Sequence, residues 1–288
     1  MTQVRQLELK TRRFMDNLAL GARASRFRGH GIEFSEVRQY QPGDPFQAID
    51  WKVTARMRRP FVKRFVEERE MGVLLVVDAS ASQRFGTERR LKSDLAAEVA
   101  SVLALSAVRS REPVGLLLFS DRIERFVRPA RGRQRNLQLL YDLVSLQPEG
   151  RGTDLALALN SAARLLKIRS LVFLISDFRG AGAFERPLFS LSARHDVVAI
   201  DVGDEAEYSP PPAGWVELAD SETGRRAVVN LADPRWSAAL AEQGRHRDTA
   251  LRRLCGRCGV DYVRLGTGQS FEADLAACIG ARKERLPG

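Results

Sequence analysis

The sequence predicts an α/β protein with a mostly parallel sheet flanked by helices, preceded by a β-rich or irregular N-terminal appendage. From Met71 onward, short apolar runs alternate with stretches of helical periodicity, which is typical of βαβ units. The first run, Val73–Val77, is apolar at every position, as a strand buried on both faces is. The chain has 288 residues, 44% of them hydrophobic, which is enough for a buried core and excludes collagen-like, disulfide-stapled and disordered classes.

Further strands are expected where short apolar runs recur. In chain order, after the first strand, these are 114–119, 171–175, 197–202 and 260–265, with 123–127 as an antiparallel partner of the second. A hairpin is expected over 215–230, where two strand-like segments flank Ser221-Glu222-Thr223-Gly224 after a run of three prolines.

Helices are expected where apolar residues repeat every three or four positions. One carries Leu95, Val99, Val102 and Leu103, with Thr87 as its expected N-cap. The others are 136–146, a helix with Leu155, Leu159 and Leu166 on one face, a long amphipathic helix over 234–257, and a short terminal helix. This order of elements predicts one α/β domain over 71–288 that includes the hairpin.

Residues 1–70 form the expected basic appendage. They contain 15 Lys and Arg and 9 Asp and Glu, with a turn at Pro42-Gly43-Asp44 and an extended segment over 61–68. A basic region of this kind suits nucleic acid, anionic lipid or an acidic protein surface, and it is equally typical of a solvated face. Charge alone does not choose among these.

Composition also bears on location. The apolar run 72–77 is far shorter than a membrane span, and residues 1–14 carry charges without the apolar centre of a secretion signal. Three cysteines in a chain of this size fit a reducing compartment. We therefore expect a cytoplasmic protein without a membrane span.

Oxygen-bearing side chains follow the first core strand as Asp78-Ala79-Ser80-Ala81-Ser82. In extended chain, positions i, i+2 and i+4 point the same way, so one carboxylate and two hydroxyls emerge together at the carboxyl end of the strand. Ligand sites of open α/β sheets lie at that edge, and hard oxygen donors suit a cation such as Mg²⁺. Asp and Ser are also ordinary turn residues, so the string alone is a weak signal.

Two later residues strengthen the signal. Thr153 follows the turn Gly150-Arg151-Gly152, and Asp177 comes directly after the apolar run 171–175. A βαβ connection of this length returns the chain to the same edge of the sheet, so all five oxygens are expected to converge. The alternative is that Thr153 only caps a helix and that Asp177 only forms a turn or cap.

In these residues the sequence resembles the von Willebrand factor A fold, whose metal-ion-dependent adhesion site uses D-x-S-x-S, a Thr and an Asp from three loops. The resemblance implies Asp78, Ser80, Ser82, Thr153 and Asp177 as the metal site. It implies Mg²⁺ as the usual ion, with Mn²⁺ or Ca²⁺ as alternatives. It also implies an open coordination position for an acidic side chain of a partner protein.

The segment Arg28–Asp44 (RGHGIEFSEVRQYQPGD), followed by Ile49-Asp50-Trp51 and Ala55-Arg56, looks like the signature of the bacterial domain of unknown function 58 family. The similarity covers nearly the whole chain, and the family implies a MoxR-type AAA+ ATPase as partner. Gln83 departs from the Met that is common in the family after the second serine. The segment's acidic residues interleave with Arg28, Arg38 and Arg56, which indicates either a structural charge network or a docking surface for the ATPase.

The function expected from these patterns is a non-enzymatic, metal-dependent protein-binding module working with the ATPase on a client complex. Cys255 and Cys258 form a C-x-x-C pair, but it falls at the end of a helix without a second pair, so packing is expected. Nucleic-acid binding through the basic region lacks a supporting aromatic-rich strand. A metal-dependent hydrolase lacks an evident nucleophile or base, so no enzyme activity is expected.

Overall fold

The computed structural model describes residues 33–66, 71–87, 90–180 and 182–285. The chain divides into two compact units, one over 26–70 and the other containing the whole of 71–288. Each unit is described by itself below.

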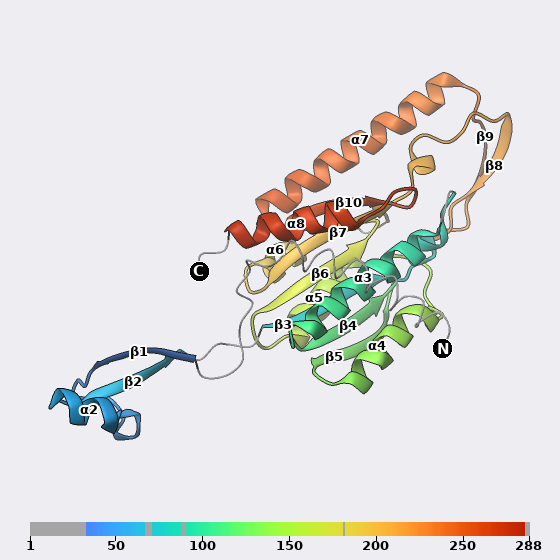
Figure 1. Cartoon of the computed structure of the whole chain (residues 1–288). Helices are drawn as coiled ribbons and strands as arrows, with labels where there is room; N and C mark the ends of the chain where they lie inside the picture. The colour runs from blue at the N-terminus through green and yellow to red at the C-terminus, as the bar shows by residue number, and fades with distance from the viewer. Residues whose placement is uncertain (1–32, 67–70, 88–89, 181, 286–288) are drawn as a thin grey trace. The chain divides into compact units, whose positions relative to one another are not determined.

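The described part of the smaller unit is a two-stranded antiparallel ribbon with one short helix (Figure 1). Its elements are β1 (Glu33–Gln39), η1 (Phe46–Ala48), α2 (Trp51–Met57) and β2 (Phe61–Val66). The sequence did not predict α2. That helix begins after Asp50, whose Oδ1 accepts hydrogen bonds from the backbone N–H groups of Lys52 and Val53, so a local cap sets its start.

The expected charge network includes an ion pair between Arg38 and Asp44. The Arg38 guanidinium donates to both carboxylate oxygens of Asp44, at 2.9 and 2.6 Å, and Asp44 also accepts from the backbone N–H of Gln41. The pair fixes the turn at 42–44. Arg28, with the neighbouring glycines of the signature segment, lies outside the described residues.

The larger unit is built on a six-stranded sheet in the order β10-β7-β6-β3-β4-β5 (Figure 1). All neighbours pair in parallel except β4 and β5, which are antiparallel. The strands are β3 (Gly72–Asp78), β4 (Val114–Phe119), β5 (Ile123–Ala130), β6 (Ser170–Ser176), β7 (Asp196–Gly203) and β10 (Asp261–Gly266). The α/β architecture with a mostly parallel sheet, predicted from the sequence, is confirmed.

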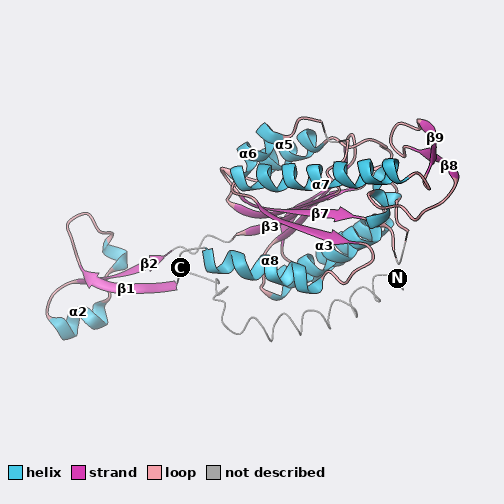
Figure 2. Ribbon diagram, turned by 90° about the horizontal axis from the view of Figure 1, so that it is seen from above, coloured by secondary structure: helices cyan, strands magenta, loops and turns pink. Residues whose placement is uncertain are grey.

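Helices cover both faces of this sheet (Figure 2). One face packs against α3 (Lys92–Arg109), α4 (Arg133–Ser145) and α8 (Glu272–Arg285). The other packs against α5 (Leu155–Leu165), α6 (Glu185–Ser192) and α7 (Pro234–Arg257). Successive β3 residues alternate between them: Leu75 joins the first core and Leu74 the second, as the strand's period of two requires.

Helix starts follow local capping signals in some places and long-range contacts in others. The α7 helix begins at Pro234 as predicted, because Asp233 accepts from the backbone N–H of Arg235 and proline suits the first helical turn. The predicted N-cap of α3 is wrong. That helix begins after Leu91, while the Thr87 hydroxyl and N–H donate to Asp204 at 2.7 and 3.0 Å.

The remaining elements lie at the carboxyl ends of the strands or beyond them. These are η2 (Ala81–Arg84), η3 (Glu205–Glu207), β8 (Trp215–Ala219) and β9 (Arg226–Asn230). Strands β8 and β9 pair antiparallel as the predicted hairpin and form a sheet of their own. Among the described helices, none combines the length and the apolar character that crossing a bilayer requires.

Candidate metal centre

Asp78 lies at the carboxyl end of the central strand β3, between β4 and β6. Only 3% of it is exposed. Its Oδ1 accepts a hydrogen bond from the backbone N–H of Ser80 at 2.9 Å, and its Oδ2 accepts from the Ser176 hydroxyl at 2.5 Å. These bonds fix the carboxylate at the edge of the sheet where the sequence placed it.

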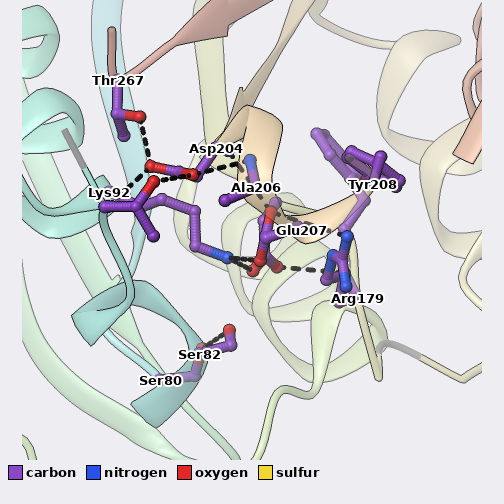
Figure 3. A network of polar contacts seen from close by, with 12 residues as sticks. Ser80, Ser82, Lys92, Arg179, Asp204, Ala206, Glu207, Tyr208 and Thr267 are labelled. Carbon is purple, nitrogen blue, oxygen red and sulfur yellow. Dashed lines mark hydrogen bonds and ion pairs between the residues drawn. The ribbon is translucent and has the colours of Figure 1, made fainter. Parts of the chain in front are cut away.

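The two serines come together because the chain turns into η2 immediately after Ser80. The Ser80 and Ser82 hydroxyl oxygens lie 3.0 Å apart, and both residues are buried (Figure 3). Asp177 follows β6, which pairs with β3. A hydrogen bond from Ser82 helps to lower the pKa of Asp177. Asp78, Ser80, Ser82 and Asp177 therefore form one buried cluster.

Thr153 sits on an adjoining loop that the β4–β5 turn supports. The Gly150 N–H donates to Glu124 at 2.8 Å, and a Cβ at Gly150 would lie only 2.1 Å from the Ser120 hydroxyl oxygen, so a larger residue there would displace neighbouring side chains. This loop joins the Asp78 turn through a 2.9 Å bond from Ala81 N–H to the Arg151 carbonyl. The Thr153 hydroxyl donates to Glu222 Oε1 at 2.7 Å.

Thr153 is not the N-cap of α5, which was the alternative to a metal-binding role. The N-cap of α5 is Asp154, whose Oδ1 accepts from the backbone N–H of Leu157 at 2.8 Å. The Thr153 hydroxyl donates instead to Glu222. The alternative for Asp177 was that it only forms a turn or cap. Its Oδ1 does accept from the backbone N–H of Arg179 in a local turn, but its Oδ2 accepts a hydrogen bond from a lysine.

That lysine, Lys92, is a site residue that the sequence analysis missed. Its side chain is fully buried, and Nζ lies 2.6 Å from both Asp177 Oδ2 and Glu207 Oε1. Arg179 approaches the other oxygen of Glu207 at 3.5 Å (Figure 3). One signal was available: Lys92 stands three residues before Leu95, on the face that the helical period assigns to the core.

The two carboxylates of the cluster have opposite electrostatic environments. Burial, reinforced by the charge of Asp177, raises the pKa of Asp78 to about 7 against the hydrogen bonds from Ser176 and Ser80. Burial acts in the same direction on Asp177, but the Lys92 ammonium and the hydrogen bonds to that carboxylate outweigh it and lower the pKa of Asp177. Asp78 is therefore the buried carboxylate that lacks charge compensation.

The donor set fits a hard divalent cation. Three hydroxyls and two carboxylates supply oxygen ligands of the kind that Mg²⁺, Mn²⁺ and Ca²⁺ prefer. Among the described residues, no group of three or more His, Cys, Asp or Glu side chains is arranged to hold a metal. Of the five expected ligands, the structure brings Asp78, Ser80, Ser82 and Asp177 together, whereas the Thr153 hydroxyl donates to Glu222.

A cavity of about 570 Å³ flanks the cluster on the side of α3 and α4. Asp78 and Ser80 are among its lining residues, together with the apolar side chains of Leu118 and Leu143. Gln83 also lines it, and both polar atoms of its buried side-chain amide lack a hydrogen-bond partner in the structure.

The surroundings of Cys255 and Cys258 do not favour redox or zinc chemistry. Cys255 is buried in α7, and Cys258 is the residue that ends the helix. Burial, with smaller contributions from Cys258 and Asp201, raises the pKa of Cys255 to about 12. The thiolate needed for redox or zinc chemistry is thus disfavoured at neutral pH.

An open α/β sheet with buried hydroxyls and carboxylates clustered at its carboxyl edge defines this chain as a protein with a candidate cation site at that edge. Comparison with known sequences specifies the family. Residues 36–250 match the family described as "Protein of unknown function DUF58", and the chain belongs to that family.

Relatives share most of the chain. The uncharacterized protein Rv1480 of Mycobacterium tuberculosis is 34% identical over 286 residues, which cover 97% of this chain and 89% of that protein. A protein of Paracoccus denitrificans, described by its position in the moxR 3′ region, is 37% identical over 98 residues, 34% of this chain and 92% of that protein.

Solved structures with a related arrangement include the SpRpn10 VWA domain. That domain is 11% identical, with a TM-score of 0.40, and the match covers 73% of this chain and 94% of the domain.

Proposed function

We propose that this chain is a non-enzymatic, metal-dependent protein-binding module. Asp78, Ser80, Ser82, Thr153 and Asp177 would hold one Mg²⁺, with Mn²⁺ or Ca²⁺ as alternatives. When bound, the ion would offer one coordination position to an Asp or Glu side chain of a partner protein. The observation that carries the proposal is the buried cluster of Asp78, both serines and Asp177 at the carboxyl edge of the sheet.

The balance of charge favours binding of an acidic partner. Lys92 already compensates Asp177, and the hydrogen bonds to Asp78 come from neutral groups. Because Lys92 and Arg179 compensate Asp177 and Glu207, only the Asp78 carboxylate would offset the charge of a divalent ion, which would keep positive character. A carboxylate from a partner is the ligand that this residual charge attracts most strongly.

Hydrolysis is a weaker interpretation of the same residues. Metal-assisted hydrolysis needs a water or side-chain nucleophile and a group that accepts its proton. Lys92 and Arg179 act as hydrogen-bond donors or cations toward Asp177 and Glu207. The Ser176 hydroxyl is fully buried and donates to Asp78, which the proposal uses as a metal ligand.

The proposed partner is a MoxR-type AAA+ ATPase. The Paracoccus denitrificans relative in the moxR 3′ region supports this pairing. In the proposal the ATPase performs work on a client complex in the cytoplasm, in assembly or maturation, and the metal centre makes the contact dependent on the ion.

Binding of the cognate ATPase to the immobilised full chain tests the proposal. We expect binding in Mg²⁺, loss of binding in chelator, and loss with Asp78→Ala or Thr153→Val in protein that remains folded by circular dichroism. Thr153→Ser keeps the hydroxyl and is the matched control, so it should bind as the wild type does. Binding that is unchanged by chelator and by both variants would contradict the mechanism.

A further inference from the structure

The hairpin formed by β8 and β9 presents one acidic side chain to the candidate metal centre. Its turn is ordered by Asp220, whose Oδ1 accepts from the backbone N–H groups of Glu222 and Thr223 at 2.9 and 2.7 Å. Gly224 adopts a positive φ of 70°, which closes the turn. This geometry fixes the backbone from which the Glu222 side chain projects.

Glu222 differs from its neighbours in burial. Residues 217–221 and 223–228 are exposed, whereas Glu222 is partly buried. A glutamate at the tip of an exposed hairpin normally stays in water, because desolvating a carboxylate costs free energy unless a partner compensates it. The contacts of this side chain therefore require an explanation.

The Glu222 carboxylate lies between two loops that carry proposed metal ligands. Oε1 accepts the 2.7 Å hydrogen bond from the Thr153 hydroxyl. Oε2 lies against the backbone of Gly180, three residues after Asp177, where a Cβ would be only 2.7 Å away. Gly180 has a φ of +61° and no side chain, so it leaves room for the carboxylate.

From this placement we infer that Glu222 is an internal ligand of the cation site. It occupies the coordination position that an acidic side chain of a partner would otherwise take, and the hairpin over 215–230 thereby caps the site. The inference rests on the proposed function, which it extends with a mode of regulation. A partner's carboxylate must displace Glu222, and the tether gives Glu222 a high effective concentration in that competition.

Titration of the full chain with Mg²⁺ by calorimetry tests the inference without any partner. Glu222→Gln removes the ionised oxygen with little change of shape and should weaken Mg²⁺ binding by about tenfold, as loss of a supporting ligand contact typically does. Glu217→Gln is the matched control, because Glu217 lies on the same hairpin, is exposed and pairs with Arg226. Its Mg²⁺ affinity should equal that of the wild type.

Hydrogen exchange of the hairpin amides over 220–225 supplies a second measurement. Mg²⁺ should slow exchange there in the wild type and in Glu217→Gln but leave it unchanged in Glu222→Gln, because the ion anchors the turn through this carboxylate. Equal Mg²⁺ affinity in wild type and Glu222→Gln, or Mg²⁺ protection that persists in Glu222→Gln, would overturn the inference.

Asp78→Asn separates failure of the inference from failure of the proposed function. If Asp78→Asn abolishes Mg²⁺ binding while Glu222→Gln leaves it unchanged, the cation site stands and the internal ligand is wrong. If the wild type binds no Mg²⁺, or if Asp78→Asn binds it as the wild type does, both are wrong.

Discussion

Lys92 Nζ lies 2.6 Å from Asp177 Oδ2 in the interior of the larger unit, and both side chains are almost completely buried. The lysine comes from the first turn of α3, and the aspartate follows β6, 85 residues later in the chain. Glu207 shares the same ammonium at 2.6 Å. The Lys92 ammonium lowers the pKa of Asp177, whereas burial raises the pKa of Asp78, whose hydrogen bonds come from neutral groups.

Removing the lysine should destabilise the fold strongly. Lys92→Met leaves the buried Asp177 carboxylate without its cation and takes one of two cations from Glu207, which keeps Arg179. Breaking a buried pair in this way typically costs about 3 to 5 kcal/mol. Urea unfolding measures the change. Lys167→Met, at an exposed lysine, is the control and should change the free energy of unfolding by less than about 0.5 kcal/mol. A similar small change in Lys92→Met would contradict the role given to this contact.

The stability of the metal-free protein should depend on Asp78 between about pH 4 and pH 7. The pKa of Asp78 rises to about 7 on folding, so the folded state holds its proton more tightly than the unfolded chain. Stability from this group is therefore present below the unfolded pKa near 4 and is lost as pH rises toward 7, by on the order of 2 to 4 kcal/mol.

The measurement is urea unfolding in chelator from pH 4.5 to 8. Wild type should lose stability over this range relative to Asp78→Asn, which cannot titrate at that position. Asp177 contributes in the opposite sense, since its lowered pKa stabilises the fold above the unfolded pKa and this stability is lost as pH falls through the folded pKa. Parallel curves for wild type and Asp78→Asn would refute the assignment.

Mg²⁺ should stabilise the protein more at pH 8 than at pH 5. Ligand carboxylates must be ionised to bind the ion, so protonated Asp78 competes with it. Thermal unfolding with and without the ion gives the difference directly. A shift in Tm of the same size at both pH values would show that the ion binds elsewhere.

Gln83→Met should raise stability by about 1 kcal/mol. Both polar atoms of the Gln83 amide are buried without a partner in the structure, and such atoms carry a desolvation penalty that an apolar side chain of similar length avoids. Gln134→Met, at an exposed position of α4, should have little effect. A loss of stability in Gln83→Met would indicate that the amide is satisfied by water in the adjoining cavity.

The cap proposed for the hairpin has a consequence for partner binding. If Glu222 occupies the site in most molecules, Glu222→Gln should tighten binding of the cognate ATPase at saturating Mg²⁺ by about fivefold or more, because the competent fraction rises. Glu217→Gln should bind as the wild type does. Surface plasmon resonance at two Mg²⁺ concentrations measures both, and weaker binding by Glu222→Gln would contradict the competition.

The sequence predicted those parts of the fold that depend on local signals. The start of α7 follows from Asp233 and Pro234, and β4 has the bounds expected from its apolar run. The N-cap of α3 was predicted wrongly, because Thr87 binds Asp204, 117 residues away. No local pattern encodes such a contact.

The same distinction applies to the candidate centre. The D-x-S-x-S string and the residue after β6 could be located because strand ends meet at one edge of the sheet. Glu207 and Glu222 could not, since each reaches the site from a loop whose course depends on the completed fold. The sequence places Lys92 on the apolar face of a predicted helix, but it does not reveal that Asp177 and Glu207 are its partners.

The central claim is that five oxygens at the sheet edge hold one divalent ion. Crystals of the full chain grown with Mn²⁺ test it most directly, because anomalous scattering locates that ion. The account predicts one strong anomalous peak within about 2.5 Å of oxygens from Asp78, Ser80 and Ser82, and no such peak in Asp78→Asn. A wild-type structure at saturating Mn²⁺ with no peak at this position would contradict it.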